Sequence, residues 1–176
     1  MSKKAEEEGR VEMEIYLMQH GEAYPEDQDP ERSLTPKGEE QIRSTGKALK
    51  KLGVDVDLMV SSPKKRARQT AEIVAGELDS SKEGIEITES LEPLAPSEDF
   101  IAYLRRFGDR RKVLLAGHLP SLGKIAANLM SEGGDVSIHF EMGGVCRIDV
   151  EALPTHAGDL RWVLPPAHLR LLAEGK

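Results

Sequence analysis

The feature that most constrains the fold is the uninterrupted apolar run Val113-Leu114-Leu115-Ala116. A run without alternating polar residues is typical of a strand buried on both faces, as in the middle of a parallel sheet. Further apolar runs at 12–18 and 56–60 are each followed by a loop or helix signal and then by helical spacing of apolar residues. This alternation indicates an α/β fold, which we expect to be a three-layer α/β/α sandwich with a mainly parallel sheet.

The C-terminal part of the chain has a different pattern. Strand-like runs at 136–140, 145–150 and 160–164 are separated by glycine-containing turns. Their close spacing predicts an antiparallel hairpin or meander, and hence an antiparallel edge on the sheet. The length of 176 residues suits one domain, which we place at 12–176. The charged stretch at 1–11 is expected to be a frayed or disordered tail.

Sequence signals for helix starts occur between the predicted parallel strands. Thr35 followed by Pro36 predicts a helix that ends at Gly53, because Thr is a good N-cap, Pro is favoured at the first helical position and Gly terminates helices. Ser62-Pro63 repeats the signal and predicts a helix to about residue 78. Further helices are expected at 99–107, 120–130 and 168–172. Gly38 costs up to about 1 kcal/mol relative to alanine, which either reflects close packing or is simply tolerated.

Composition excludes several classes of function. The chain has 24 Lys+Arg against 31 Asp+Glu and only 4% aromatic residues, which argues against nucleic-acid binding. No apolar stretch approaches the roughly 20 residues of a membrane span, and the charged N-terminus does not resemble a signal peptide. The one cysteine, Cys146, excludes an internal disulfide and is expected to be buried and inert. We therefore expect a cytoplasmic protein that does not bind a membrane.

Three chemically distinctive motifs follow predicted strands. Gln19-His20-Gly21 follows the first, the segment 62–70 follows the second, and Gly117-His118-Leu119-Pro120 follows the central one. Ligands of open parallel sheets bind beyond the carboxyl ends of the strands. His20, Arg66 and His118 are therefore expected to converge, although each of them alone would more often be a surface or core residue.

The chemistry of these three residues suits phosphate. Arg66 falls in the first turn of its predicted helix, where free backbone amides favour anions, and its planar guanidinium matches phosphate oxygens. A neutral imidazole at His20 is a good nucleophile toward phosphorus. Arg66 and His118 would stabilise the charge on the transferring phosphoryl group.

Neither a metal nor another cofactor is expected. The histidines are not spaced as a zinc site, and no acidic cluster resembles a magnesium site. We interpret His139, His156 and His168 as structural or surface residues, and Trp162 as a core residue.

Four segments together resemble the histidine phosphatase superfamily, also called phosphoglycerate-mutase-like, and most of all its small SixA-type phosphohistidine phosphatases. Residues 17–23 match the nucleophile motif, 33–38 the Leu-Thr-x-x-Gly segment, 62–70 the arginine-bearing motif and 117–120 the second-histidine motif. The matches follow the family's order over nearly the whole chain from about residue 12. The absence of a large insertion after the arginine motif favours the SixA type over sugar-phosphate mutases and large acid phosphatases.

The resemblance implies a phosphoglycerate-mutase-like fold and a site without a cap. It implies His20 as the phosphorylated nucleophile, with Gln19, Arg66 and His118 also binding the phosphate or another oxyanion. The implied activity is a metal-independent phosphatase that acts on phosphohistidine in phosphorelay proteins, such as histidine-containing phosphotransfer domains. We expect the protein to be a monomer.

Two departures from the family pattern keep alternatives open. Gln19 stands where the family has arginine, and the loss of a charged hydrogen bond of roughly 1.5–3 kcal/mol would cost one or two decades in affinity or rate. No glutamate stands cleanly at the position of the general acid of mutase-like members, and Glu22, Glu89 and Glu92 are the candidates. The alternatives are a phosphatase of small phosphomonoesters and a degenerate member that binds phosphate or a phosphoprotein without turnover.

Overall fold

A single six-stranded sheet forms the centre of the computed structural model, which describes residues 13–80 and 84–175. The strands are β1 (Met13–Gln19), β2 (Leu58–Ser61), β3 (Ile85–Ile87), β4 (Lys112–Gly117), β5 (Val145–Val150) and β6 (Asp159–Leu164). Their order in the sheet is β3-β2-β4-β1-β5-β6. The first four strands are parallel to one another, and β5 and β6 add an antiparallel edge next to β1. The predicted tail at 1–11 lies outside the described residues.

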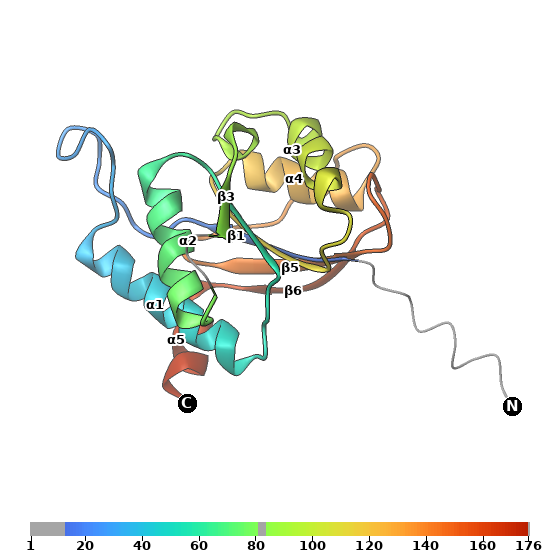
Figure 1. The fold of residues 1–176 in the computed structure, drawn as a ribbon. Coiled ribbons are helices and arrows are strands. Elements are labelled where there is room, and N and C mark those ends of the chain that lie inside the picture. The colour runs from blue at the N-terminus through green and yellow to red at the C-terminus, as the bar shows by residue number, and fades with distance from the viewer. Residues whose placement is uncertain (1–12, 81–83, 176) are drawn as a thin grey trace, which may run out of the picture.

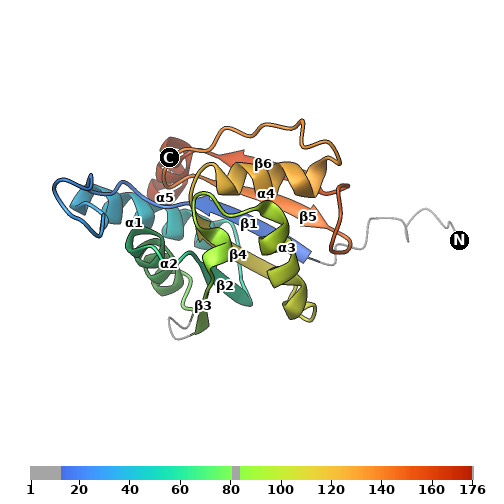
Figure 2. The ribbon, with the colours of Figure 1, turned by 90° about the horizontal axis from the view of Figure 1, so that it is seen from above.

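Helices cover both faces of this sheet (Figures 1 and 2). The α-helices are α1 (Pro36–Lys51), α2 (Lys65–Glu77), α3 (Ser97–Leu104), α4 (Ser121–Met130) and α5 (Pro166–Glu174), and two 3₁₀ turns are η3 (Glu89–Leu91) and η4 (Arg105–Phe107). Helices α1, α2 and α5 lie on one face, and α3 and α4 lie on the other (Figure 1). This arrangement confirms the predicted α/β sandwich with its antiparallel edge. None of the described helices is long and apolar enough to cross a bilayer.

The central strand β4 links two hydrophobic clusters. Val113 and Leu115 pack into the cluster on the side of α3 and α4, whereas Leu114 and Ala116 pack into the cluster on the side of α1, α2 and α5. All four side chains are fully buried, as their uninterrupted apolar run predicts. Cys146 is also fully buried, and burial raises the pKa of its thiol to about 12, so it is the inert core residue that we expected.

The start of α1 matches its sequence signal. The Thr35 side chain accepts a hydrogen bond of 3.0 Å from the backbone N–H of Gly38, and Pro36 is the first helical residue. The chain leaves the helix through Gly53, whose φ of +73° is in the left-handed region that favours glycine. The local sequence signals therefore correctly predict both ends of this helix.

Two predictions about local structure are wrong. Helix α2 begins at Lys65 rather than directly after Ser62, and Lys64 occupies the N-cap position without a side-chain cap. The segment 136–140 is not a strand. Its side chains Ile138 and Phe140 nevertheless pack on the core, whereas Val136 is exposed, so the apolar run indicated part of the burial but not backbone pairing.

The close approach of α1 to the segment after β1 yields a stability prediction. A Cβ atom at Gly38 would lie 2.0 Å from the carbonyl oxygen of Glu22, so Gly38→Ala requires the backbone to move. We expect Gly38→Ala to lower the free energy of unfolding by about 1–3 kcal/mol in urea titrations. Gly123→Ala in α4 is the control, because its nearest neighbour would lie at 3.8 Å and alanine favours the helix by about 1 kcal/mol. Equal midpoints for the two variants would contradict this account.

Candidate active site

Backbone pairing brings the three sequence motifs together at one end of the sheet. Gln19 of β1 pairs with Gly117 of β4, and Ser61 of β2 pairs with Ala116 of the same strand. The pairing continues one residue further on each side, because the His20 N–H donates to the Gly117 carbonyl at 3.1 Å and the residue after Ser61 donates to the Ala116 carbonyl at 3.1 Å. The ends of these strands therefore lie side by side, as the sequence predicted.

One ring nitrogen of His20, Nε2, is unprotonated. Its Nδ1 lies 2.7 Å from the Gly21 carbonyl oxygen, which can only accept, so Nδ1 carries the hydrogen. Nε2 then accepts from Nε of Arg66 at 3.3 Å. Burial lowers the pKa of His20 to about 4, opposed by the Gly21 hydrogen bond and helped by the charges of Arg66 and Arg32. The ring is therefore neutral at pH 7, which is the form that can act as a nucleophile.

His118 lies against His20, with 5.0 Å between the ring centroids and 57° between the ring planes. Its Nε2 is 2.9 Å from the hydroxyl oxygen of Ser62, and its Nδ1 is buried without a hydrogen-bond partner among the described residues. Burial, followed by the charges of His20, Arg66, Lys64 and Arg32, lowers the pKa of His118 to about 3. The second ring is thus neutral as well.

Arg66 supplies a permanent positive charge to this pair of neutral rings. Its side chain lies in the first turn of α2, is 8% exposed, and forms no ion pair with a carboxylate within the described ranges. Thr70, one turn later, donates to the Arg66 carbonyl at 2.7 Å and accepts from the Gly21 N–H at 3.1 Å. Thr70 therefore joins the helix that carries Arg66 to the loop that follows His20. A buried cation without a counter-charge is costly and favours an anionic ligand.

Arg32 is a functional candidate that the sequence analysis missed. It lies near the end of the acidic loop before α1, and its backbone has a φ of +51°, which is unusual for a residue other than glycine. Its Nε donates to the Tyr24 carbonyl at 3.4 Å, and its charge lowers the pKa values of His20, His118 and Arg66. Nothing in the local sequence indicated that this arginine acts on the two histidines, because it stands alone in a loop rich in Pro, Asp and Glu.

The side chain of Gln19 is not joined to the two histidines. No hydrogen bond links it to His20, Arg66 or His118, and its Oε1 is buried without a partner in the part of the chain that the structure describes. Its main-chain carbonyl accepts from the N–H of Gly143 at 3.1 Å. A phosphate-binding role for Gln19 thus stays a prediction.

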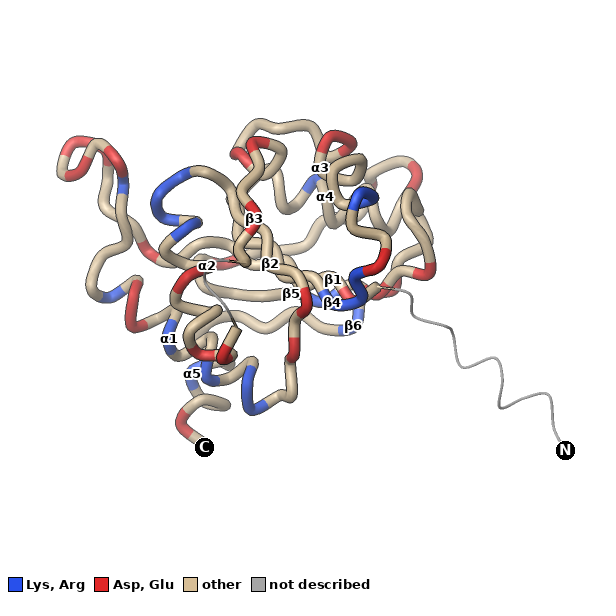
Figure 3. Tube along the Cα trace, in the orientation of Figure 1, with Lys and Arg blue, Asp and Glu red and all other residues tan. Residues whose placement is uncertain are grey.

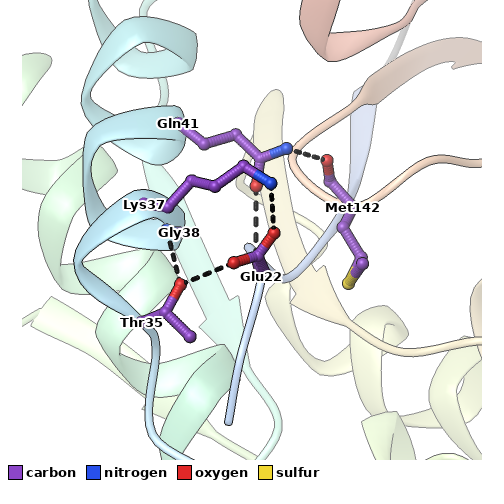
Figure 4. Close-up of polar contacts among 6 residues, drawn as sticks. All are labelled: Glu22, Thr35, Lys37, Gly38, Gln41 and Met142. Atoms are coloured by element: carbon purple, nitrogen blue, oxygen red, sulfur yellow. Dashed lines mark hydrogen bonds and ion pairs between the residues drawn. The ribbon is translucent and has the colours of Figure 1, made fainter.

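Glu22 is held in its ionised form at the start of α1 (Figure 4). Its carboxylate accepts hydrogen bonds from Lys37 at 2.7 Å and from the hydroxyl of Thr35 at 2.9 Å, and these bonds lower its pKa. A carboxyl group with a lowered pKa is a poor general acid at neutral pH. Of the other candidates, Glu89 is exposed, and Glu92 pairs at 3.5 Å with Lys64, whose charge acts on His118.

Hydrogen bonds connect the loop after β1, helix α1 and the turn before β5 (Figure 4). The amide of Gln41 accepts from the Glu22 N–H at 3.1 Å and donates to the Met142 carbonyl at 2.7 Å. The next residue of the turn, Gly143, donates to the His20 carbonyl at 3.2 Å. The main chain at His20 and at Glu22 is therefore held by hydrogen bonds to residues that are distant in sequence.

An open groove of about 720 Å³ runs beside Arg66, between the acidic loop and the start of α2. Its lining residues are Glu26, Pro30, Glu31, Arg32, Pro63, Lys64, Lys65, Arg66, Arg68, Gln69 and Glu72. Along the backbone drawn in Figure 3, acidic residues predominate in the loop before α1 and basic residues predominate at the start of α2. An ion pair of 2.6 Å between Lys65 and Glu31 joins the two sides.

The remaining histidines lie apart from this cluster. His139 and His168 are exposed, and Nδ1 of His156 bonds to the Asn128 carbonyl at 2.6 Å. Trp162 is partly buried against the core on the side of α1 and α5. Within the described ranges, no group of three or more His, Cys, Asp or Glu side chains is arranged to hold a metal ion.

Comparison with known proteins assigns the family. A model of the histidine phosphatase superfamily (branch 1) matches residues 15–93. The phosphohistidine phosphatase SixA homolog of Haemophilus influenzae is 32% identical over 136 residues, which are 72% of this chain and 83% of that protein. Phosphohistidine phosphatase SixA of Escherichia coli is 26% identical over 162 residues, with 90% and 98% of the two chains covered.

A solved structure shows the same relationship. The protein histidine phosphatase SixA complexed with tungstate superposes with a TM-score of 0.78 at 26% identity, covering 89% of this chain and 99% of the other. The chain therefore belongs to the histidine phosphatase superfamily. Within that superfamily it is of the SixA type.

The two buried histidines predict a pH dependence of stability. Their pKa values of about 4 and about 3 in the folded protein lie below the ordinary value of 6.5, so the unfolded chain binds more protons as the pH falls below 6.5. The free energy of unfolding should therefore decrease from pH 6.5 to about pH 4, by on the order of 3 kcal/mol for His20 alone. Urea unfolding of the native protein and His20→Asn at pH 7 and pH 4.5 measures this contribution. The same loss in both proteins would contradict the assignment.

Proposed function

We propose that this chain is a metal-independent phosphatase that forms a phosphohistidine intermediate on His20 and dephosphorylates phosphohistidine in phosphorelay proteins. The observation that carries the proposal is the state of the His20 ring. Its Nδ1 hydrogen is used by the Gly21 carbonyl, and its Nε2 electron pair points to Arg66. A neutral nucleophile beside a buried cation is the arrangement that phosphoryl transfer requires.

The reaction divides into two steps. In the first, Nε2 of His20 attacks phosphorus, the P–N bond to the substrate imidazole breaks, and the leaving imidazole takes up a proton from solvent. Before this attack, Arg66 exchanges its hydrogen bond to Nε2 for one to a phosphoryl oxygen, which frees the Nε2 electron pair, and His118 and Arg32 stabilise the same phosphoryl group. In the second step water attacks phosphorus, the P–Nε2 bond breaks, and phosphate leaves with the proton from water distributed to it or to solvent.

The choice of a phosphohistidine substrate follows from the state of the candidate acids. Glu22 is held ionised by Lys37 and Thr35 and is unsuited to protonating a leaving group. An imidazole leaving group needs less protonation than an alkoxide, so a P–N bond suits this site better than a phosphomonoester. The relatives named phosphohistidine phosphatases support the same substrate class.

We further infer that the protein is a cytoplasmic monomer that binds an oxyanion and acts on a protein substrate. The related SixA structure contains tungstate, a tetrahedral oxyanion like phosphate, which supports phosphate as the ligand here. The open groove beside Arg66 supports a phosphate carried on the surface of another protein, such as a histidine-containing signalling protein. The single buried thiol of Cys146 fits a reducing compartment.

The test is phosphate release from a phosphohistidine-bearing protein without added metal. We expect turnover by the native enzyme and none above background by His20→Ala, because the nucleophile is missing. His168→Ala is the matched control, since it removes an exposed imidazole on α5. A small phosphomonoester is assayed in parallel and should be hydrolysed far more slowly.

The other outcomes identify the alternatives. Hydrolysis of the ester at an equal or higher rate would replace the proposal with a small-molecule phosphatase. Binding of phosphate without turnover of either substrate would make the chain a binding module, which is the alternative that Gln19 favours.

Gln19 itself yields a prediction about affinity. Restoring the family's arginine with Gln19→Arg should tighten binding of inorganic phosphate about tenfold, because one charged hydrogen bond is gained. Without phosphate the buried, unpaired charge should lower the unfolding temperature. Gln28→Arg adds the same charge to an exposed loop position and serves as the calorimetric control. Unchanged or weaker phosphate affinity of Gln19→Arg relative to that control would show that this side chain does not reach the ligand.

A further inference from the structure

A buried hydrogen bond joins the second strand end to the third. The hydroxyl oxygen of Ser62 lies 2.9 Å from Nε2 of His118, and these residues are 0% and 2% exposed. The Ser62 N–H also donates to the Ala116 carbonyl at 3.1 Å, so Ser62 is fixed to β4 two residues before His118. The sequence pattern had suggested Ser62 as a helix cap, but the helix begins further on and leaves its hydroxyl available for His118.

The hydrogen atoms of this pair can be arranged in two ways. In one, Ser62 donates to Nε2 and accepts from the Lys64 N–H at 3.3 Å, so that its hydroxyl is satisfied in both directions and the ring hydrogen is on Nδ1. In the other, Nε2 carries the hydrogen and donates to Ser62. The hydroxyl hydrogen of Ser62 and the electron pair of Nδ1 then both lack a partner among the described residues.

The first arrangement leaves one buried polar group unsatisfied and the second leaves two. Buried polar groups almost always have hydrogen-bond partners, and each one left without a partner costs free energy. We propose that Ser62 is a positioning residue that fixes His118 as the Nδ1–H tautomer by donating its hydroxyl hydrogen to Nε2.

The two histidines would then have the same tautomeric form but different roles. His20 uses its Nδ1 hydrogen on the Gly21 carbonyl, and its unprotonated Nε2 accepts from Nε of Arg66, a hydrogen bond that a bound anion can replace. His118 uses its Nε2 electron pair on Ser62 and keeps an N–H free at Nδ1. The first ring can attack, and the second can donate a hydrogen bond to an anion. That this N–H holds a phosphoryl oxygen rests on the function proposed above, whereas the tautomer is a property of the resting protein.

Nitrogen-15 NMR tests the tautomer directly. The full chain is labelled with ¹⁵N-histidine and long-range ¹H–¹⁵N spectra are recorded at pH 7, with the His118 signals assigned by their loss in His118→Asn. We expect a protonated-type nitrogen at Nδ1 and a hydrogen-bonded, unprotonated-type nitrogen at Nε2. A hydrogen on Nε2, or a doubly protonated ring, would overturn the proposal whatever the enzyme's activity.

Three variants test the role of the hydroxyl. Ser62→Ala should allow the Nε2–H tautomer to appear and weaken binding of inorganic phosphate about tenfold. Ser62→Thr keeps the hydroxyl and should retain the native tautomer with affinity within about twofold. Ser61→Ala is the matched control, because Ser61 is equally buried but donates to the Ser62 carbonyl at 2.9 Å. A native tautomer in folded Ser62→Ala would refute the role of Ser62.

The proposed function and the proposed tautomer can be refuted independently of each other. If the native protein does not turn over phosphohistidine, the function is wrong while the tautomer measurement still stands. If Ser62→Ala does not fold, which thermal unfolding beside Ser61→Ala reveals, the spectrum of the native protein alone decides the tautomer.

Discussion

The site depends on the hydrogen-bonded pairing of β4 with β1 on one side and β2 on the other. This pairing fixes the register of three strand ends, so residues that are 46 and 56 positions apart in sequence come into direct contact. A shift of one residue in either register would turn the side chains to the opposite face of the sheet. The fully buried β4 core, which resists such slippage, is therefore what places the functional side chains.

Burial then determines the protonation states. Both histidines lie in a region that also contains Arg66, Arg32 and Lys64, and desolvation together with these charges keeps the rings neutral. The site thus has positive charge from its guanidinium and ammonium groups and an unprotonated nitrogen on an uncharged ring, the form that the proposed nucleophile needs. If the imidazole itself supplied the positive charge, both of its nitrogens would be protonated and neither would have an electron pair for attack.

Sequence reasoning succeeded where the signal was local and failed where it was not. The Thr35 cap, the buried β4 run and the convergence of the three motifs follow from short patterns and from sheet geometry. Arg32 was missed because its effect acts through space from an acidic loop. Ser62 was assigned to a cap because its true partner, His118, lies across the sheet edge. The segment 136–140 shows that a strand-like apolar run can place side chains on the core without revealing whether a neighbouring strand edge is available.

The position of the turn before β5 has a consequence for the modularity of the molecule. The family match ends at residue 93, yet Gly143 holds the His20 carbonyl, and β4 lies between β1 and β2. A fragment cut at residue 93 would keep β1, β2 and β3, but it would lack β4, the strand that joins β1 to the β2–β3 pair. Residues 15–93 are therefore not a self-contained folding unit, because the sheet and the position of His20 both depend on segments that follow.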